Sequence, residues 1–356
     1  MKDSNQPRMR TSPRNPQQTG KKAYRKGLKP DAAEAVSYPH RWGVVLAGGD
    51  GVRLRDLTRL IVGDDRPKQF CPLFGERTLL AQARQRAERS IGSESILFAL
   101  TGAHQDYYLG DLGDCPSQRV VQPRNRGTAP AILYTLLDIA RRDRDAIVAI
   151  LPCDHYYSDE GLFTLALESA FKIAGTRPRS VVLLGAQPNA PEVEYGWIEI
   201  GATVNDKLFH VRCFHEKPPL HVAEHLLETG SLWNTFVMVG HVDGFLEMAR
   251  SAVPGLLTVF QSAMRDSHRN GETRISDSLY DWVSPTDFSR QILSPAARRL
   301  VTLRLENIEW HDLGDPDRVL STLLARDTEL PIWARSWQAA RKTAGSSVPC
   351  SSTAVA

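Results

Sequence analysis

A short glycine-rich loop carries the residue types that bind phosphate. Gly48, Gly49 and Gly51 follow a buried apolar run, and glycine lets backbone amides converge closely on phosphate oxygens. Arg53 adds a charged, forked donor suited to phosphate, and Lys68 adds a mobile cation for a departing or bridging phosphate. We therefore expect this segment to hold a phosphorylated ligand.

The glycine spacing argues against two commoner phosphate motifs. Residues 48–53 read GGDGVR, which is not the GxGxxG pattern of dinucleotide-binding folds, and no GK[ST] follows, as a P-loop requires. A structural alternative is an ordinary strand-to-loop turn, since glycines also gather at turns for steric reasons.

Two aspartates are candidates for holding a metal ion. Asp154 follows the apolar run 146–151, and Asp312 lies at the end of the segment that begins with the alternating run 300–305. In open α/β sheets ligands bind outside the carboxyl ends of the strands, so both carboxylates are placed to hold a metal on a triphosphate. The alternative for either is a turn or a helix cap. We interpret His155 as a structural partner of Asp154.

Seven ordered motifs resemble one known family. LAGGDGVRL with RPKQF resembles the signature of sugar-phosphate nucleotidyltransferases, in particular the mannose-1-phosphate guanylyltransferases. NRGTAPAI, LPCDH, YGWIEI, FHEKP, WNT and WHDLGD follow in the family's order. The resemblance spans roughly residues 42–325.

The resemblance implies a role for each motif. It implies a nucleotide pocket lined by Leu46, Ala47, Gly48, Gly49, Gly51, Asn125, Gly127 and Thr128. It also implies a sugar-phosphate site formed by Tyr195, Gly196, Glu216, Lys217 and Asn234. Without the resemblance, Tyr195 is equally well a core aromatic of a β-hairpin, and Glu216 with Lys217 is a solvated charge pair.

Several positions depart from the family's pattern. Phe236 stands where glycine usually follows WN[ST], and Val52 replaces a threonine of the glycine loop. Arg55 and Asp56 replace Trp-Pro, and residues 60–66 lengthen the segment before Pro67. These departures leave the base and the sugar less certain than the reaction.

The implied activity is transfer of a guanylyl group from GTP to mannose 1-phosphate, giving GDP-mannose and pyrophosphate. Asp154 and Asp312 would hold Mg²⁺, while Arg53 and Lys68 would assist the departing pyrophosphate. The nucleophile is already anionic, so no general base is needed. The rival hypotheses are the same reaction with another nucleoside triphosphate or hexose 1-phosphate, a non-catalytic nucleotide-sugar sensor, and a nucleic-acid-binding protein that uses its basic arm.

The elements that must position these residues are those of an α/β fold. Apolar runs predict strands at 44–46, 96–100, 146–151, 181–186, 232–240 and 300–305, and helical spacing predicts helices at 78–89, 128–142 and 222–230. Thr128 is the expected N-cap of the second helix. We predict a Rossmann-like, mostly parallel central sheet flanked by helices, and the resemblance implies the nucleotide-diphospho-sugar transferase type.

Composition divides the chain into three parts. Residues 1–40 are rich in Pro, Gln, Arg and Lys and are predicted to be a disordered basic arm. Residues 41–330 are predicted to form the nucleotidyltransferase domain, and residues 331–356 a C-terminal tail. The first thirty residues carry net charge +8 and the remaining chain −5, so the folded body is not expected to bind nucleic acid.

Cysteine usage and hydropathy indicate the compartment. The five cysteines are scattered, without a CxxC pair, which indicates reduced thiols in the cytoplasm. The apolar runs are too short to cross a bilayer, and no signal-peptide core is present at the N-terminus. A membrane is therefore not an expected partner, whereas the resemblance implies GTP and a sugar 1-phosphate as substrates and a homodimer is left open.

Overall fold

The computed structural model describes residues 39–113, 115, 118–264, 268–269, 272–326 and 329–345. These residues belong to one unit, 38–356, so nearly all of the predicted basic arm lies outside them. In this described part, no helix is long and apolar enough to cross a membrane. The four cysteines within it, at positions 71, 115, 153 and 213, form no disulfide.

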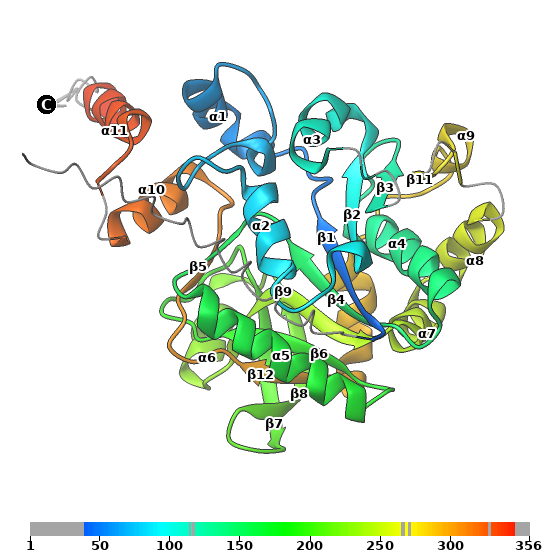
Figure 1. The fold of residues 1–356 in the computed structure, drawn as a ribbon. Helices are drawn as coiled ribbons and strands as arrows, with labels where there is room; N and C mark the ends of the chain where they lie inside the picture. Colours follow the sequence, from blue (N-terminus) through cyan, green and yellow to red (C-terminus); the bar gives the residue numbers. More distant parts are fainter. Residues whose placement is uncertain are drawn as a thin grey trace, which may run out of the picture. The chain divides into compact units, whose positions relative to one another are not determined.

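One large sheet forms the centre of the fold (Figure 1). Its described strands lie side by side in the order β10-β11-β3-β2-β1-β4-β9-β6-β12-β8-β7. Their bounds are β1 Arg41–Leu46, β2 Ile96–Thr101, β3 Arg119–Gln122, β4 Ile147–Pro152, β6 Val181–Ala186, β7 Gly196–Thr203, β8 Leu208–Glu216, β9 Leu232–His241, β10 His268–Arg269, β11 Glu272–Arg274 and β12 Leu300–Arg304.

The sheet is mixed, which corrects the prediction of a mostly parallel one. β3, β2, β1 and β4 are parallel neighbours, as the strand–helix–strand pattern predicts, and β6 is parallel to β12. However, β9 lies antiparallel between β4 and β6, and β8 is antiparallel to both β12 and β7. An apolar run predicts a strand but not its direction, because its pattern reads the same both ways. The direction follows from the connection, and the chain reaches β9 through a hairpin and a helix.

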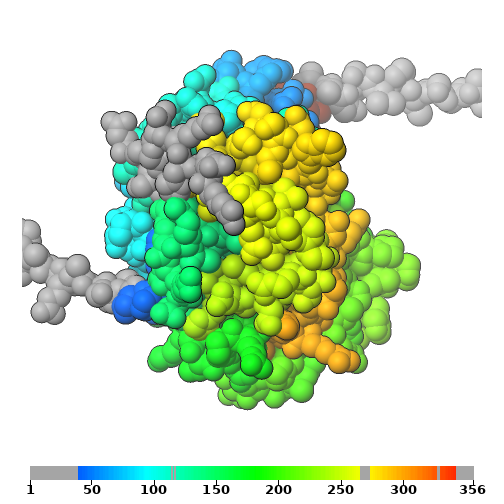
Figure 2. Space-filling model, turned by 90° about the vertical axis from the view of Figure 1, so that its right-hand side faces the viewer, coloured from blue at the N-terminus to red at the C-terminus, as the bar shows by residue number. Residues whose placement is uncertain are grey.

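Helices cover both faces of the sheet. α2 (Leu79–Ala87), α3 (Gln105–Leu112), α5 (Glu160–Thr176) and α6 (Leu220–Glu228) contribute to the apolar core on one face. α4 (Thr128–Arg142), α7 (Val242–Ala252), α8 (Pro254–Ala263) and α9 (Asp277–Tyr280) contribute to the core on the other. Figure 2 shows α7 and α8 on this second side, beside α4. Val45 belongs to the first core and Val44 to the second, which explains the continuous apolar run of β1.

A third apolar cluster lies beside the sheet. It joins α1 (Arg55–Val62), α10 (Pro316–Ala325) and α11 (Ile332–Gly345). The predicted tail thus begins with a helix, in which Ala334 is fully buried. Asp315 caps α10, because its carboxylate accepts a hydrogen bond from the Arg318 backbone N–H at 2.9 Å.

Candidate active site

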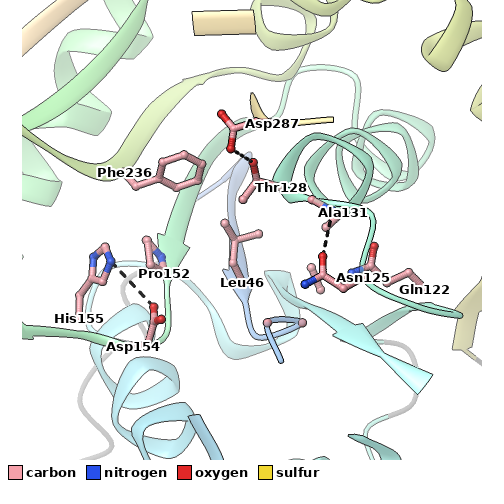
Figure 3. Close-up of a pocket in the computed structure, with 14 residues that line it drawn as sticks. Leu46, Gln122, Asn125, Thr128, Ala131, Pro152, Asp154, His155, Phe236 and Asp287 are labelled. Atoms are coloured by element: carbon pink, nitrogen blue, oxygen red, sulfur yellow. Dashed lines mark hydrogen bonds and ion pairs between the residues drawn. The ribbon is translucent and has the colours of Figure 1, made fainter. Parts of the chain in front are cut away.

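Two neighbouring cavities open at the carboxyl ends of β1 and β4. The first, of about 340 Å³, contains Asn125, Thr128 and Phe236 in its lining (Figure 3). The second, of about 290 Å³, is lined by the glycine loop with Arg53 and Lys68. Leu46, Gly49 and Asp154 line both cavities. The predicted nucleotide residues are thereby divided between them, with Gly48, Asn125, Gly127 and Thr128 in the first and Ala47 and Gly51 in the second.

The glycine loop is held open by a buried amide. The Gln69 side-chain nitrogen donates hydrogen bonds to the carbonyl oxygens of Ala47 and Gly49, at 3.0 and 2.7 Å. Gly51 adopts φ +59°, which is the left-handed region that the glycine pattern predicts. These two carbonyls are therefore already engaged, and both Gln69 and Arg53 line the second cavity.

Lys68 and Asp154 form an ion pair at the second cavity. The Lys68 Nζ lies 2.9 Å from Asp154 Oδ2 and donates a 2.6 Å hydrogen bond to the Leu313 carbonyl oxygen. Burial raises the pKa of the Asp154 carboxyl, but the Lys68 ammonium and His155 outweigh it and bring that pKa to about 2. Asp154 is therefore a permanent negative charge at neutral pH.

A two-stranded ribbon brings Asp312 beside Asp154. β5 (His155–Tyr157) pairs antiparallel with β13 (Trp310–Asp312), with Asp312 opposite His155, and the Leu313 N–H donates to the Asp154 carbonyl oxygen at 3.1 Å. Asp312 forms an ion pair with Arg318. Gly314 lines the second cavity. A Cβ atom added to Gly314 would lie within 3.3 Å of both Asp312 Oδ2 and an Arg53 guanidinium nitrogen, so the two side chains meet at this glycine.

These two carboxylates fit a hard divalent cation. Both supply oxygen donors, Asp154 from the lining of the cavity that the glycine loop and Arg53 border, and Asp312 from a position outside that lining, against Gly314. In the described ranges, neither aspartate belongs to a group of three protein donors close enough to hold an ion unaided. The arrangement therefore suits a cation shared with a ligand's phosphates.

The start of α4 forms the opposite wall of the first cavity. Asn125 Oδ1 accepts the Gly127 N–H at 2.9 Å, and the Asn125 amide donates to Asp50 Oδ2 at 3.2 Å. The prediction of Thr128 as N-cap is wrong by one residue, since Gly127 occupies the cap and Thr128 begins the helix. The Thr128 hydroxyl instead accepts the Phe288 N–H at 2.8 Å, which anchors this wall to a distant segment.

Gly127 should tolerate no side chain. Its φ is +89° with an extended ψ, and an added Cβ would lie 2.5 Å from the Thr286 carbonyl oxygen. We expect Gly127→Ala to lower the free energy of unfolding by about 3 kcal/mol in a denaturant titration. Gly255→Ala in α8 is the matched control, because its Cβ meets nothing within 4 Å, and it should raise stability by about 0.5 kcal/mol. Equal effects of the two changes would contradict this explanation.

Three predicted sugar residues converge at one point. Gly196 on β7 pairs with Glu216 on β8, and Glu216 Oε2 and Asn234 Cβ lie 3.0 and 3.4 Å from a Cβ position built on Gly196. Burial raises the pKa of the Glu216 carboxyl, and the neighbouring charge of Asp287, which lines the first cavity, raises it further. Tyr195 is buried against Trp233 and Trp310, with ring centroids 5.0 and 4.9 Å away, so it also serves the core.

Glu194 connects the sugar residues to the glycine loop. Its Oε2 lies 3.5 Å from both Arg53 Nη1 and Lys217 Nζ. Arg53 and Lys217 are half-exposed, so these are weak, screened pairs that a phosphate could replace. Glu194, which the sequence analysis did not select, thus links Arg53, a predicted catalytic residue, with Lys217, a predicted sugar-phosphate residue.

Other lining residues were also missed. Asp287 belongs to a Pro-Thr-Asp turn far along the chain, and Gln122 ends β3, so neither has a local motif. Gln122 accepts a 2.6 Å hydrogen bond from the Tyr280 hydroxyl. The position of Gln122 at the end of a buried strand could have identified it, because ligands bind outside the carboxyl ends of the strands in open α/β sheets.

His155 lies beside Asp154, as its interpretation as a structural partner of that residue predicts. Its Nδ1 accepts a hydrogen bond from the Trp310 indole at 3.2 Å, and its Nε2 lies 3.8 Å from Asp154 Oδ1. Burial lowers the pKa of the imidazole, although Asp154 opposes this shift. The Trp310 indole therefore fixes the imidazole beside Asp154.

Comparisons with known proteins agree with this architecture. Residues 42–327 match the family model described as "Nucleotidyl transferase". The "Xanthan biosynthesis protein XanB" of Xanthomonas campestris is 30% identical over 276 residues, 76% of this chain and 57% of the relative. A "Mannose-1-phosphate guanylyltransferase" of Escherichia coli K12 is 31% identical over 65% of this chain and 48% of the relative. The chain thus spans about half the length of these curated relatives.

A solved structure extends the similarity to the fold. It is described as a mannose-1-phosphate geranyltransferase from Thermus thermophilus, and it is 26% identical with a TM-score of 0.68. The alignment covers 81% of this chain and 80% of that one. The overall fold of this chain is therefore similar to that of the Thermus thermophilus protein.

Proposed function

The chain belongs to the nucleotidyl transferase family, and from this premise we propose that it transfers the guanylyl group of GTP to mannose 1-phosphate, giving GDP-mannose and pyrophosphate. The names of the relatives support the sugar and the base. One structural observation carries the proposal. Asp154 lines both cavities, of which one is bordered by the glycine loop, Arg53 and Lys68, and the other has a volume of about 340 Å³, which would admit a nucleoside.

The reaction needs positioning more than proton transfer. A phosphate oxygen of the sugar 1-phosphate attacks the α-phosphorus of the triphosphate, the new P–O bond forms, and the bond to the β-phosphate's bridging oxygen breaks. The electron pair leaves with pyrophosphate, on which negative charge accumulates. Arg53 and Lys68 line the second cavity and are placed to stabilise that charge, while Lys217 is placed for the sugar's phosphate.

Asp154 and Asp312 are the residues that would hold Mg²⁺. A bound divalent ion would neutralise part of the triphosphate charge at the cavity that the glycine loop and Arg53 line. Lys68 keeps Asp154 ionised and oriented through the Leu313 carbonyl, so the carboxylate is ready without further deprotonation.

A substrate screen tests the proposal. Pyrophosphate release is measured with each nucleoside triphosphate against mannose, glucose and other hexose 1-phosphates in the presence of Mg²⁺. We expect GTP with mannose 1-phosphate to give the highest kcat/KM. A different best pair would establish the same chemistry with another substrate. Tight GDP-mannose binding without pyrophosphate release from any pair would establish a sensor instead.

Phe236 is expected to contribute to the choice of sugar. It adopts φ +57°, a region that costs a non-glycine residue about 1 kcal/mol, and its ring lines the first cavity beside Asn234, whose Oδ1 accepts the Phe236 N–H at 3.1 Å. We expect Phe236→Gly to lower the preference for one hexose 1-phosphate over another about fivefold, because the space gained accepts alternative hydroxyl orientations.

Phe236→Leu is the control for this prediction, since it retains an apolar side chain in the cavity. Its ratio of kcat/KM values between mannose and glucose 1-phosphates should stay within twofold of the unmodified protein. If Phe236→Gly changes the KM for GTP and leaves the sugar ratio unaltered, the ring serves the nucleotide instead.

A further inference from the structure

We propose that the β7–β8 hairpin carries a zinc site formed by Glu199, Cys213 and His215. These residues line neither of the two cavities of the candidate active site. Each offers one donor atom, and the three donor atoms lie within 4.8 Å of one another. All three side chains are partly exposed, so an ion can reach them from solvent.

The strand register creates this group. Glu199 pairs directly with Cys213, and His215 lies two residues farther along β8, on the same face of the hairpin. The residues between them, Ile198 and Phe214, point to the buried side and belong to the core. Side chains that are fourteen and sixteen positions apart in sequence are thereby fixed as neighbours by backbone pairing.

The donor set suits zinc in particular. A thiolate, an imidazole and a carboxylate are the three ligand types that zinc takes in proteins, and the charges of Cys213 and Glu199 balance that of the ion. Tetrahedral coordination separates such donors by about 3.3–3.6 Å. His215 Nε2 and Glu199 Oε2 are already 3.3 Å apart, and Cys213 Sγ lies within 4.8 Å of a donor atom of each.

A β-bulge adds a supporting contact. The register shifts between the pairs Glu199–Cys213 and Ile200–Val211, which leaves Arg212 as the extra residue. The Arg212 guanidinium lies 2.7 Å from Glu199 Oε1 and is largely exposed. It therefore orients the carboxylate through one oxygen and leaves the other, Oε2, directed toward His215.

A second cluster in the described residues serves as a comparison. His40, Asp143 and Asp145 also place three donors together, but they provide no thiolate. Both Asp143 oxygens already accept hydrogen bonds, from the Trp42 indole at 2.9 Å and from His40 at 3.0 Å. This group is the weaker candidate for zinc because it contains no thiolate donor.

Cobalt and zinc titrations of the full chain test the site. With Co²⁺ we expect one equivalent to produce a thiolate-to-metal charge-transfer band in the near ultraviolet, and Zn²⁺ should abolish the band by displacement. Zn²⁺ should also raise the melting temperature, because the ion binds the paired hairpin and not the separated strands. Cys213→Ser should eliminate the band, and Glu199→Gln and His215→Ala should each weaken Zn²⁺ binding at least tenfold.

Matched controls make the test decisive. Cys115→Ser removes another partly exposed thiol, and His40→Ala removes the imidazole of the comparison cluster, so both should leave the titration unchanged. Circular dichroism of each variant establishes that it folds. If Cys213→Ser does not fold, Glu199→Gln takes its place as the variant that tests the site. Absence of a band in the unmodified chain, or persistence of the band in a folded Cys213→Ser variant, would overturn the proposal.

Discussion

Replacing Asp154 with asparagine is expected to lower kcat for pyrophosphate release about 1,000-fold, equivalent to about 4 kcal/mol of transition-state stabilisation. The change keeps the shape of the side chain and removes the charge at the wall shared by both cavities. The amide cannot hold a divalent cation as a carboxylate does, and it leaves the Lys68 ammonium without its partner at 2.9 Å. The measurement is steady-state kinetics with GTP and mannose 1-phosphate.

The loss should be independent of pH between 6 and 8. Burial raises the pKa of Asp154, but Lys68 and His155 lower it to about 2, so the carboxylate is fully ionised over this whole range. A ratio of unmodified to Asp154→Asn activity that rises with pH in this window would show that the carboxylate titrates there, which contradicts the argument. Asp56→Asn is the control, because Asp56 is an exposed residue of α1 that pairs only weakly with Arg59, and it should change kcat less than twofold.

Replacing Lys68 with methionine is expected to lower kcat about 100-fold and the free energy of unfolding by about 2 kcal/mol. The Lys68 side chain is only 12% exposed, and its ammonium joins Asp154 to the Leu313 carbonyl. Methionine fills the space of the aliphatic stem but leaves a carboxylate and a carbonyl oxygen without their donor. Lys207→Met is the matched control, since Lys207 pairs with Glu306 on the surface and should affect neither quantity measurably.

The combination of the two variants separates a joint role from independent ones. If Lys68 and Asp154 act as one unit, the Lys68→Met/Asp154→Asn protein should lose much less transition-state stabilisation than the sum of the two single losses. Strict additivity would show that Lys68 assists the leaving group without help from Asp154. The double variant should also recover part of the lost stability, because no unpaired charge is left in the cavity wall.

The proposed function depends on residues contributed by separate parts of the chain. The glycine loop, the start of α4 and the β5–β13 ribbon each supply a different wall, and β7, β8 and β9 supply Gly196, Glu216 and Asn234 at one point. The sensor hypothesis has no need for cations around a leaving pyrophosphate. The kinetic variants therefore test the residues that the proposed function requires, and the substrate screen tests its substrates.

Local sequence patterns determined the elements and the glycine loop. The strand of residues 181–186 has the bounds that its apolar run predicts, and Thr78 caps α2 at the predicted helix start. The ordered motifs identified the family, which the comparison with the nucleotidyl transferase model confirms. These features depend on short stretches of backbone and on side-chain periodicity, so they are readable without knowledge of the neighbours in space.

Tertiary structure decided the remaining features. The antiparallel placement of β9, the contact of Lys68 with Leu313 and the bridging by Glu194 join segments that lie far apart along the chain. Phe236 in the left-handed region and Gly127 against Thr286 likewise depend on what packs beside them. The physical reason is that hydrophobic periodicity identifies which side of an element is buried, whereas strand order and ion-pair partners follow from how whole elements pack together.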